Sequence, residues 1–231
     1  MPTTSSRIED RYGDIRERLE RACRSAGRLS SDVKLVAVSK RQPDAHVEAM
    51  RQTGQEDFGE NLIQEWMRKR ETFLHDRSIR WHVIGPVQKN KAKFVVRGRP
   101  ALLHTLDRPE LVEALERRLD QSWTLSGLIQ VNIDAEGQKA GCSPEDLRKL
   151  AERIARSPHI ELRGLMCIPA AAGRSRDAFE RLRALGEGIE DLCGGRPELS
   201  MGMSHDFEDA IREGATIIRV GSALFGPRPT G

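Results

Sequence analysis

Along most of the sequence, short apolar runs rich in β-branched residues alternate with amphipathic stretches. The runs that predict strands cover 33–39, 57–61, 80–85, 101–107, 125–133, 161–169, 199–203 and 216–226. The intervals between them show helical spacing, and strict alternation of strands and helices is typical of a parallel sheet with helical crossovers. Eight such units in about 200 residues match the lower size limit of a closed (β/α)8 barrel.

An open doubly wound sheet shares this alternation. Its first strand–helix turn usually carries the pattern G-x-G-x-x-G, whereas here that turn reads SKRQPDA and has no glycine. We therefore predict an α/β fold with one domain over 1–231, in which 33–226 form a TIM-type barrel. An extra N-terminal helix at 5–27, closed by Gly27, is expected to pack on it. Its apolar face would consist of Ile8, Tyr12, Ile15, Leu19 and Cys23.

Two helix starts are predicted from capping residues. Asp107 stands three residues before Glu110, which is the spacing of a capping box, so a helix is expected directly after Asp107. Ser143 and Pro144 are expected to open the helix that follows 125–133, because serine caps helices and proline suits their first turn.

Composition and charge bound the class of protein. The net charge of the 231 residues is only +3, which gives no reason to expect a nucleic acid or an anionic membrane as partner. The polar N-terminus lacks the apolar core of a signal peptide, and no apolar run approaches membrane-spanning length. The four cysteines are far apart and form no cluster with histidines, so we expect free thiols, a cytoplasmic location and no metal site.

Lys40 follows the first predicted strand, at the carboxyl end where barrel enzymes build their sites. A lysine in this position has two interpretations. Its stem can cover apolar surface while its ammonium reaches water, or partial desolvation in a pocket can make its amine a nucleophile. Asn61 and other polar residues stand at the ends of neighbouring strands, so a ligand site is expected at this mouth of the barrel.

The loops after the last two strands predict an anion site at the same mouth. Gly202 and Ser204 precede a helix, whose free N–H groups and dipole favour an anion. Gly221 and Ser222 end the last strand, where a glycine lets a phosphate approach the backbone closely. Each loop alone has a structural explanation, with Ser204 or Asp206 capping a helix and Gly221 turning the chain. Together, and opposite a strand-end lysine, the two loops favour a phosphate.

A lysine amine beside a phosphate site suggests two classes of ligand. One is a phosphosugar that reacts through a Schiff base, and the other is pyridoxal 5'-phosphate (PLP), which carries an aldehyde and a phosphate on one ring. Arg219 lies two residues before Gly221 and is therefore expected to point into the barrel, where it needs a partner. That partner is either an inner carboxylate such as Glu60 or the pyridine nitrogen of PLP.

Seven blocks of the sequence carry a more specific signal. They read LVAVSKRQP, FGENLIQE, WHVIGPVQKNK, VNIDAEGQKAG, RGLMCIP, SMGMSHDFEDAIREG and IIRVGSALFG. From about Val33 to Gly226 the chain resembles the pyridoxal phosphate homeostasis proteins, which are small relatives of the alanine racemase N-terminal barrel. The stretch AAAGRSRD departs from the pattern of that family.

The resemblance implies a fold-type III PLP barrel without a second domain. In that barrel a strand-end lysine forms an aldimine with the cofactor, two loops hold its phosphate, and an arginine faces its pyridine nitrogen. These roles would fall to Lys40 for the aldimine, to Ser204, Gly221 and Ser222 for the phosphate, to Arg219 for the ring nitrogen, and to Asn61 and Met166 for the pocket lining.

The implied role is intracellular PLP homeostasis, meaning cofactor supply and amino- and keto-acid balance without robust catalysis. PLP-dependent apoenzymes would be transient recipients, and we expect a monomer. The alternative is a PLP-dependent amino acid racemase or decarboxylase. Racemisation needs an acid–base group on each face of the substrate α-carbon. In the racemase relatives a tyrosine from a second domain serves one face, whereas the single tyrosine here, Tyr12, lies in the N-terminal helix.

Other residues have a structural explanation beside a functional one. His205 and Cys167 are the remaining candidates for a second acid–base group, but a loop histidine is more often solvated. His82 is expected to be a hydrogen-bonded core histidine. Lys139 is either near the mouth of the barrel or an exposed loop charge. The basic stretch KNKAKFVVRGR carries one aromatic residue and is expected to be a solvated helix face rather than a nucleic-acid surface.

Overall fold

The computed structural model describes residues 4–135, 137, 140–170 and 175–226. Within these ranges the sheet is a closed barrel of parallel strands in sequence order, and the last strand pairs with the first. The predicted (β/α)8 barrel is confirmed. The strands are β1 (Lys34–Val38), β2 (Asp57–Glu60), β3 (Arg80–Val83), β4 (Leu102–Leu106), β5 (Leu125–Val131), β6 (Ile160–Cys167), β7 (Glu198–Ser200) and β8 (Ile217–Val220).

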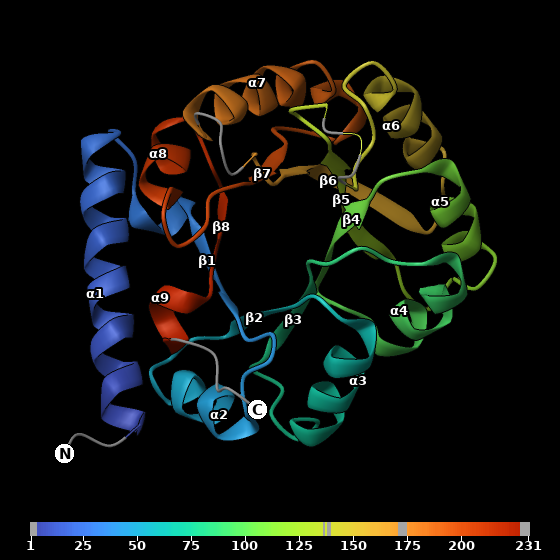
Figure 1. Ribbon diagram of the computed structural model, residues 1–231. Helices are drawn as coiled ribbons and strands as arrows, with labels where there is room; N and C mark the ends of the chain where they lie inside the picture. Colours follow the sequence, from blue (N-terminus) through green and yellow to red (C-terminus); the bar gives the residue numbers. More distant parts are fainter. Residues whose placement is uncertain (1–3, 136, 138–139, 171–174, 227–231) are drawn as a thin grey trace.

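Helices surround the strands as an outer ring, and the first helix lies outside that ring (Figure 1). None of the helices in the described part of the chain has the length and hydrophobicity needed to cross a membrane. In chain order the helices are α1 (Thr4–Ser25), α2 (Asp44–Gln52), α3 (Ile63–Thr72), α4 (Ala92–Gly98), α5 (Pro109–Glu116), α6 (Leu147–Ala155), α7 (Ser175–Glu187), α8 (Phe207–Arg212) and α9 (Ser222–Phe225).

Apolar side chains pack on both sides of the barrel wall. The larger cluster fills the space between the strands and the helices, and includes Phe58 and Trp81, whose ring centroids lie 5.8 Å apart. The smaller cluster fills the barrel interior, because residues alternate between the two sides of a strand. It consists of Val36, Leu102, Leu128, Met166 and Ile217. The interior is therefore closed by a packed layer and cannot be an open channel.

The predicted amphipathic helix at the N-terminus is confirmed as α1, which contacts α2, α8 and α9 (Figure 1). Polar contacts join α1 and the segment after it to α8. Arg18 Nε of α1 donates to Glu208 Oε1 at 2.8 Å, and Nη1 of Arg28, three residues beyond α1, donates to the carbonyl of Ile211 at 2.9 Å. The guanidinium of Arg18 also lies 4.7 Å from the ring centroid of Phe207. The buried face of α1 consists of Ile8, Ile15, Leu19, Ala22 and Cys23, while Tyr12 is half-buried.

The predicted cap of α5 is wrong. The helix begins at Pro109 and Arg108 occupies its N-cap, where no side chain caps the helix. The carboxylate of Asp107 accepts a hydrogen bond from the guanidinium of Arg108.

Two further boundaries differ from the prediction. Ser143 opens a turn over residues 144–146, in which its Oγ accepts a bond from the Asp146 N–H, and α6 begins only at Leu147. The predicted last strand, 216–226, ends at Val220, and its second half forms the short helix α9. A helix replaces the strand at the position where the phosphate loop was expected, and its first-turn N–H groups have no partner within the helix itself.

Candidate functional site

A cavity of about 410 Å³ opens at the carboxyl ends of the strands. This volume suits a small organic ligand or cofactor. The cavity brings together the ends of β1, β2 and β8 and the loop between β7 and α8. Six residues that the sequence predicts for the site line it: Lys40, Asn61, Ser204, Arg219, Gly221 and Ser222.

Met166 is the predicted site residue that the structure does not bring into the cavity. Its side chain is fully buried in the interior cluster. Ile168, two residues further along, lines the cavity and is 39% exposed. Residues two apart point to the same side of a strand. The barrel interior is therefore filled at the level of Met166, and the cavity begins closer to the carboxyl ends of the strands.

Buried charges fix the strand end that precedes Lys40. The carbonyl oxygen of Ser39 accepts a bond from Lys69 Nζ at 2.6 Å, and the Ser39 hydroxyl donates to Glu60 Oε1 at 2.7 Å. Lys69 and Glu60 are fully buried and pair at 2.7 Å. Burial raises the pKa of Glu60, and the neighbouring Lys69 ammonium opposes this. Sequence analysis missed Lys69, although it shares the apolar face of α3 with Trp66.

The residue after Lys40 is held as well. The N–H of Arg41 donates to Glu65 Oε1 at 2.6 Å, and the same oxygen accepts a bond from Lys69 Nζ at 3.0 Å. Arg41 has a φ of 58°, a left-handed conformation that costs a non-glycine residue of order 1–3 kcal/mol. The peptides on both sides of half-buried Lys40 are thus anchored to one buried cluster, which fixes where its side chain leaves the backbone.

Arg219 lies at the cavity and is only 4% exposed. Its Nη1 donates to Ser200 Oγ at 2.6 Å, and its Nη2 donates to the carbonyl of Cys167 at 2.8 Å. Glu60, the carboxylate considered as its partner, binds Lys69 instead. Burial lowers the pKa of Arg219, partly opposed by Cys167. The two described bonds use two of the five N–H groups of the guanidinium, so others can serve a ligand.

The two glycine-containing loops meet at Ser204. Its Oγ lies 3.4 Å from the N–H nitrogens of Gly221 and Ala223 and 3.3 Å from Ser222 Oγ. Ser204 therefore faces the first turn of α9 and does not cap α8, whose N-cap is Asp206. These contacts are longer than good hydrogen bonds, so the N–H groups are weakly satisfied and suited to a stronger acceptor such as a phosphate oxygen.

At two glycines in these loops the surroundings leave little room for a side chain. Gly202 has a φ of +91°, and a Cβ there would lie 2.6 Å from the Cβ of Ala210. Gly221 has an ordinary φ, but an added Cβ would lie 3.3 Å from both the Cβ and the carbonyl oxygen of Val38. β1 and β8 approach closely at this point, so a side chain there would require Val38 to shift by a few tenths of an ångström.

The other candidate residues lie in different surroundings. His82 is a buried, hydrogen-bonded core histidine, as predicted, with partners Asp57 and His104. His205 is exposed and contributes to the cavity wall. Cys167 is fully buried, and burial raises the pKa of its thiol to about 12. Lys139 lies outside the described residues. No group of three potential metal ligands was found among the residues that the structure describes.

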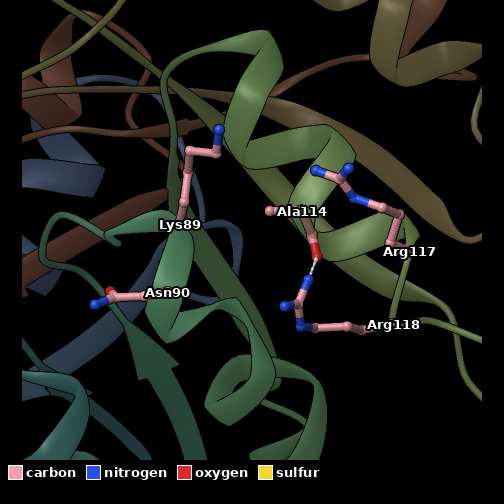
Figure 2. A pocket seen from close by; sticks show the side chains of 5 residues that line it. All are labelled: Lys89, Asn90, Ala114, Arg117 and Arg118. Atoms are coloured by element: carbon pink, nitrogen blue, oxygen red, sulfur yellow. Dashed lines mark hydrogen bonds between the residues drawn. The ribbon is translucent and has the colours of Figure 1, made fainter.

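A second hollow, of about 620 Å³, lies between the 3-10 turn Lys89–Lys91 and the end of α5 (Figure 2). Figure 2 shows Lys89 on one side of it and Arg117 and Arg118 on the other. Nη1 of Arg118 donates to the carbonyl of Ala114 at 2.7 Å. All three cationic side chains are exposed. Because water can solvate them fully, this hollow lacks the desolvated groups that the first cavity has.

The comparisons with known proteins all identify relatives of one family. The family described as alanine racemase, N-terminal domain, matches residues 13–229. A pyridoxal phosphate homeostasis protein of Pseudomonas aeruginosa is 42% identical over 230 residues, which cover 98% of each chain. Another, from Aquifex aeolicus, is 38% identical over 224 residues, which cover 95% of this chain and 97% of its relative.

A solved structure of a relative supports the same assignment. PipY of Synechococcus elongatus, determined with PLP bound, is 31% identical and has a TM-score of 0.81. The match covers 95% of this chain and 100% of that one. The sequence matches over nearly the full length, together with the closed barrel, lead to one conclusion: this chain belongs to the family of pyridoxal phosphate homeostasis proteins.

Proposed function

We propose that this protein binds PLP in the cavity at the carboxyl ends of the strands and serves in PLP homeostasis. One observation carries the proposal: the amine-bearing Lys40, Ser204 with the weakly satisfied N–H group of Gly221, and the buried Arg219 line the same cavity. The PLP bound to the similar PipY chain and the names of the curated relatives support it.

The residues present fit the three functional groups of PLP. The cofactor supplies a reactive aldehyde, and the amine of Lys40 can bond to that carbon with loss of water, giving a Schiff base. The N–H groups of Gly221 and Ala223 and the hydroxyls of Ser204 and Ser222 suit the phosphate. The guanidinium of Arg219 remains protonated and is a donor for the pyridine nitrogen.

The surroundings of the cavity favour a carrier over a racemase. Tyr12 lines a different hollow, together with Lys34 and Gln55, at the amino-terminal end of the barrel. Burial raises the pKa of the Cys167 thiol to about 12, so the thiol stays protonated at neutral pH and cannot take a proton from a substrate. His205 remains at the cavity wall but is exposed, and no described hydrogen bond orients its ring. A donor such as Arg219 also discourages protonation of the pyridine nitrogen, which weakens the ring as an electron sink.

The proposed biological role is to supply PLP to PLP-dependent apoenzymes and thereby to affect amino- and keto-acid balance in the cytoplasm. The position of the cavity at the barrel mouth supports exchange with such recipients. Ile168 and Met203, both of which line it, are 39% and 37% exposed. We propose that the protein does this as a monomer.

The test is to trap the bond to Lys40. Purified protein is incubated with PLP, reduced with borohydride and digested, and the modified peptide is identified by mass spectrometry. A pyridoxyl phosphate group on the peptide with Lys40 is expected, together with loss of the bound-cofactor absorbance on reduction. Lys40→Arg keeps the charge but lacks a reactive amine, so it should remain colourless, as should Lys40→Ala. A single adduct on Lys89 or Lys139 instead would contradict the proposal.

A further inference from the structure

A row of buried polar side chains crosses the interior of the barrel. Asp57 Oδ1 lies 2.9 Å from His82 Nε2, and His82 Nδ1 lies 2.9 Å from His104 Nε2. His104 Nδ1 in turn lies 2.8 Å from Ser200 Oγ, which accepts the 2.6 Å bond from Arg219. All five residues are at most 5% exposed. The row therefore joins Asp57, at the start of β2, to the cavity.

The chemistry of the two ends is fixed. Arg80 binds Asp57 through two bonds, Nε to Oδ1 at 2.9 Å and Nη2 to Oδ2 at 2.7 Å. Burial alone would raise the pKa of Asp57, but the hydrogen bonds from Arg80 and His82 hold it below its usual range. Asp57 is thus a carboxylate, which can only accept hydrogen bonds, whereas Arg219 can only donate them.

Together, these two ends determine which atom carries the proton in each hydrogen bond between them. The carboxylate requires a proton on His82 Nε2, so Nδ1 of a neutral His82 accepts from His104 Nε2. His104 Nδ1 is then an acceptor and takes the hydroxyl proton of Ser200. Ser200 Oγ keeps its lone pairs for Arg219. The opposite tautomer of His104 would leave the buried Ser200 hydroxyl proton without a partner among the described residues, which is costly.

We propose that Asp57, His82, His104 and Ser200 form a one-directional chain of hydrogen bonds that positions the Arg219 guanidinium toward the cofactor ring. The four are positioning residues, because they act on the ligand through Arg219. The part that concerns the cofactor ring rests on the proposed function, whereas the direction of the chain does not.

The electrostatic surroundings agree with two neutral histidines. Burial lowers the pKa of His104 well below its usual value, and the nearby groups His82, Arg219 and Lys34 lower it further. Burial also lowers the pKa of His82, although Asp57 opposes the shift. Hydrogen bonds that all point the same way polarise one another, so the Asp57 charge contributes to holding the distant guanidinium.

The first test uses the protein without added cofactor. Imidazole ¹⁵N signals, correlated with the ring carbon-bound protons, distinguish the two neutral tautomers and the charged form. At pH 7.5 we expect both His82 and His104 to be neutral with the proton on Nε2. A proton on Nδ1 of either ring, or a charged ring, would overturn the chain whether or not PLP binds.

The second test separates positioning from folding. It compares PLP with an analogue in which C–H replaces the ring nitrogen, so that only PLP can accept a bond from Arg219. Ser200→Ala is expected to weaken PLP binding about tenfold, as for one hydrogen bond to a charged group, and to leave binding of the analogue almost unchanged.

The matched control is Thr105→Val, which removes a buried hydroxyl of β4 whose partner is the carbonyl of Gly85. It should not change the ratio of the two affinities. Equal weakening of PLP and analogue in Ser200→Ala would overturn the positioning role. If the wild-type protein binds neither compound, the proposed function and the cofactor part of this inference both fail, and the ¹⁵N result alone decides the direction of the chain.

Discussion

The Nζ atom of Lys69 lies 2.6 Å from the carbonyl oxygen of Ser39, so a fully buried ammonium holds the peptide that precedes Lys40. Its two other acceptors are Glu60 and Glu65, at 2.7 and 3.0 Å. Every N–H of this ammonium therefore has a partner. Lys69 is a structural lysine, even though it is more deeply buried than the lysine that we propose to be reactive.

Lys69→Met is expected to lower the free energy of unfolding by about 3–5 kcal/mol, because it leaves the Glu60 carboxylate buried without its counter-charge. Urea titration measures this. Adding Glu60→Gln removes the remaining charge and keeps an acceptor for Ser39, so the double variant should recover much of the loss. Lys149→Met, at an exposed lysine, should stay within about 0.5 kcal/mol of the wild type. An unchanged free energy of unfolding in Lys69→Met would show that the cluster does not stabilise the strand end.

Ser204→Ala and Ser222→Ala are each expected to weaken PLP binding about tenfold, since a hydrogen bond to a charged group contributes roughly 1.5–3 kcal/mol. Equilibrium titration with PLP gives the affinities, and competition by inorganic phosphate should weaken in parallel. Ser25→Ala, whose hydroxyl bonds only within α1 among the described contacts, is the control. Unchanged affinity in both loop variants would show that these loops do not bind the phosphate. Both variants are needed, because backbone N–H groups can compensate for the loss of one hydroxyl.

The protein with PLP bound is expected to exchange the α-proton of L-alanine slowly in deuterium oxide, because the cavity lacks a well-oriented second acid–base group. Proton NMR of the amino acid follows the exchange, and chiral chromatography follows inversion. Exchange with inversion at an ordinary enzyme turnover, roughly 1–10³ per second, would contradict the role as a carrier and support that of a racemase. In that case His205→Asn identifies whether the exposed histidine at the cavity wall is the second base.

Stability should fall as the pH is lowered from 7 to 5.5. The pKa values of His82 and His104 are lowered by burial in the folded chain, whereas an unfolded histidine titrates near 6.5. Below that pH the unfolded state binds more protons, so each histidine contributes a slope of at most about 1.4 kcal/mol per pH unit. His104→Asn should reduce the slope of unfolding free energy against pH, and the exposed-site control His205→Asn should not. An unchanged slope in His104→Asn would show that His104 is already charged when folded.

The barrel and most of its mouth could be predicted from the sequence because the signals are local. Alternating apolar runs and helical spacing fix the element order, and strand-end polar residues then meet at one face. α9 was missed because its four residues, Ser222–Phe225, are too short to show a helical period and are apolar enough to continue a strand.

The buried polar contacts could not be predicted, since their partners are distant in the chain. His104 and Ser200, for example, are 96 residues apart. A usable signal did exist for Lys69, which lies three residues after Trp66 and six after Ile63 and so shares the apolar face of its helix. What the sequence cannot supply there is the pair of carboxylates that makes such a burial tolerable.

The first helix contacts α8 and α9, the two helices that directly follow the loops carrying Ser204 and Gly221. Local unfolding of α1 would expose their outer faces, so amide hydrogen exchange in α8 and α9 should accelerate whenever exchange in α1 does. By thermodynamic linkage, whatever stabilises α8 and α9 also stabilises the attachment of α1 to them. A ligand that tightens the two loops raises the free energy required to detach the first helix, even though that helix lies outside the ring and none of its described side chains lines the cavity.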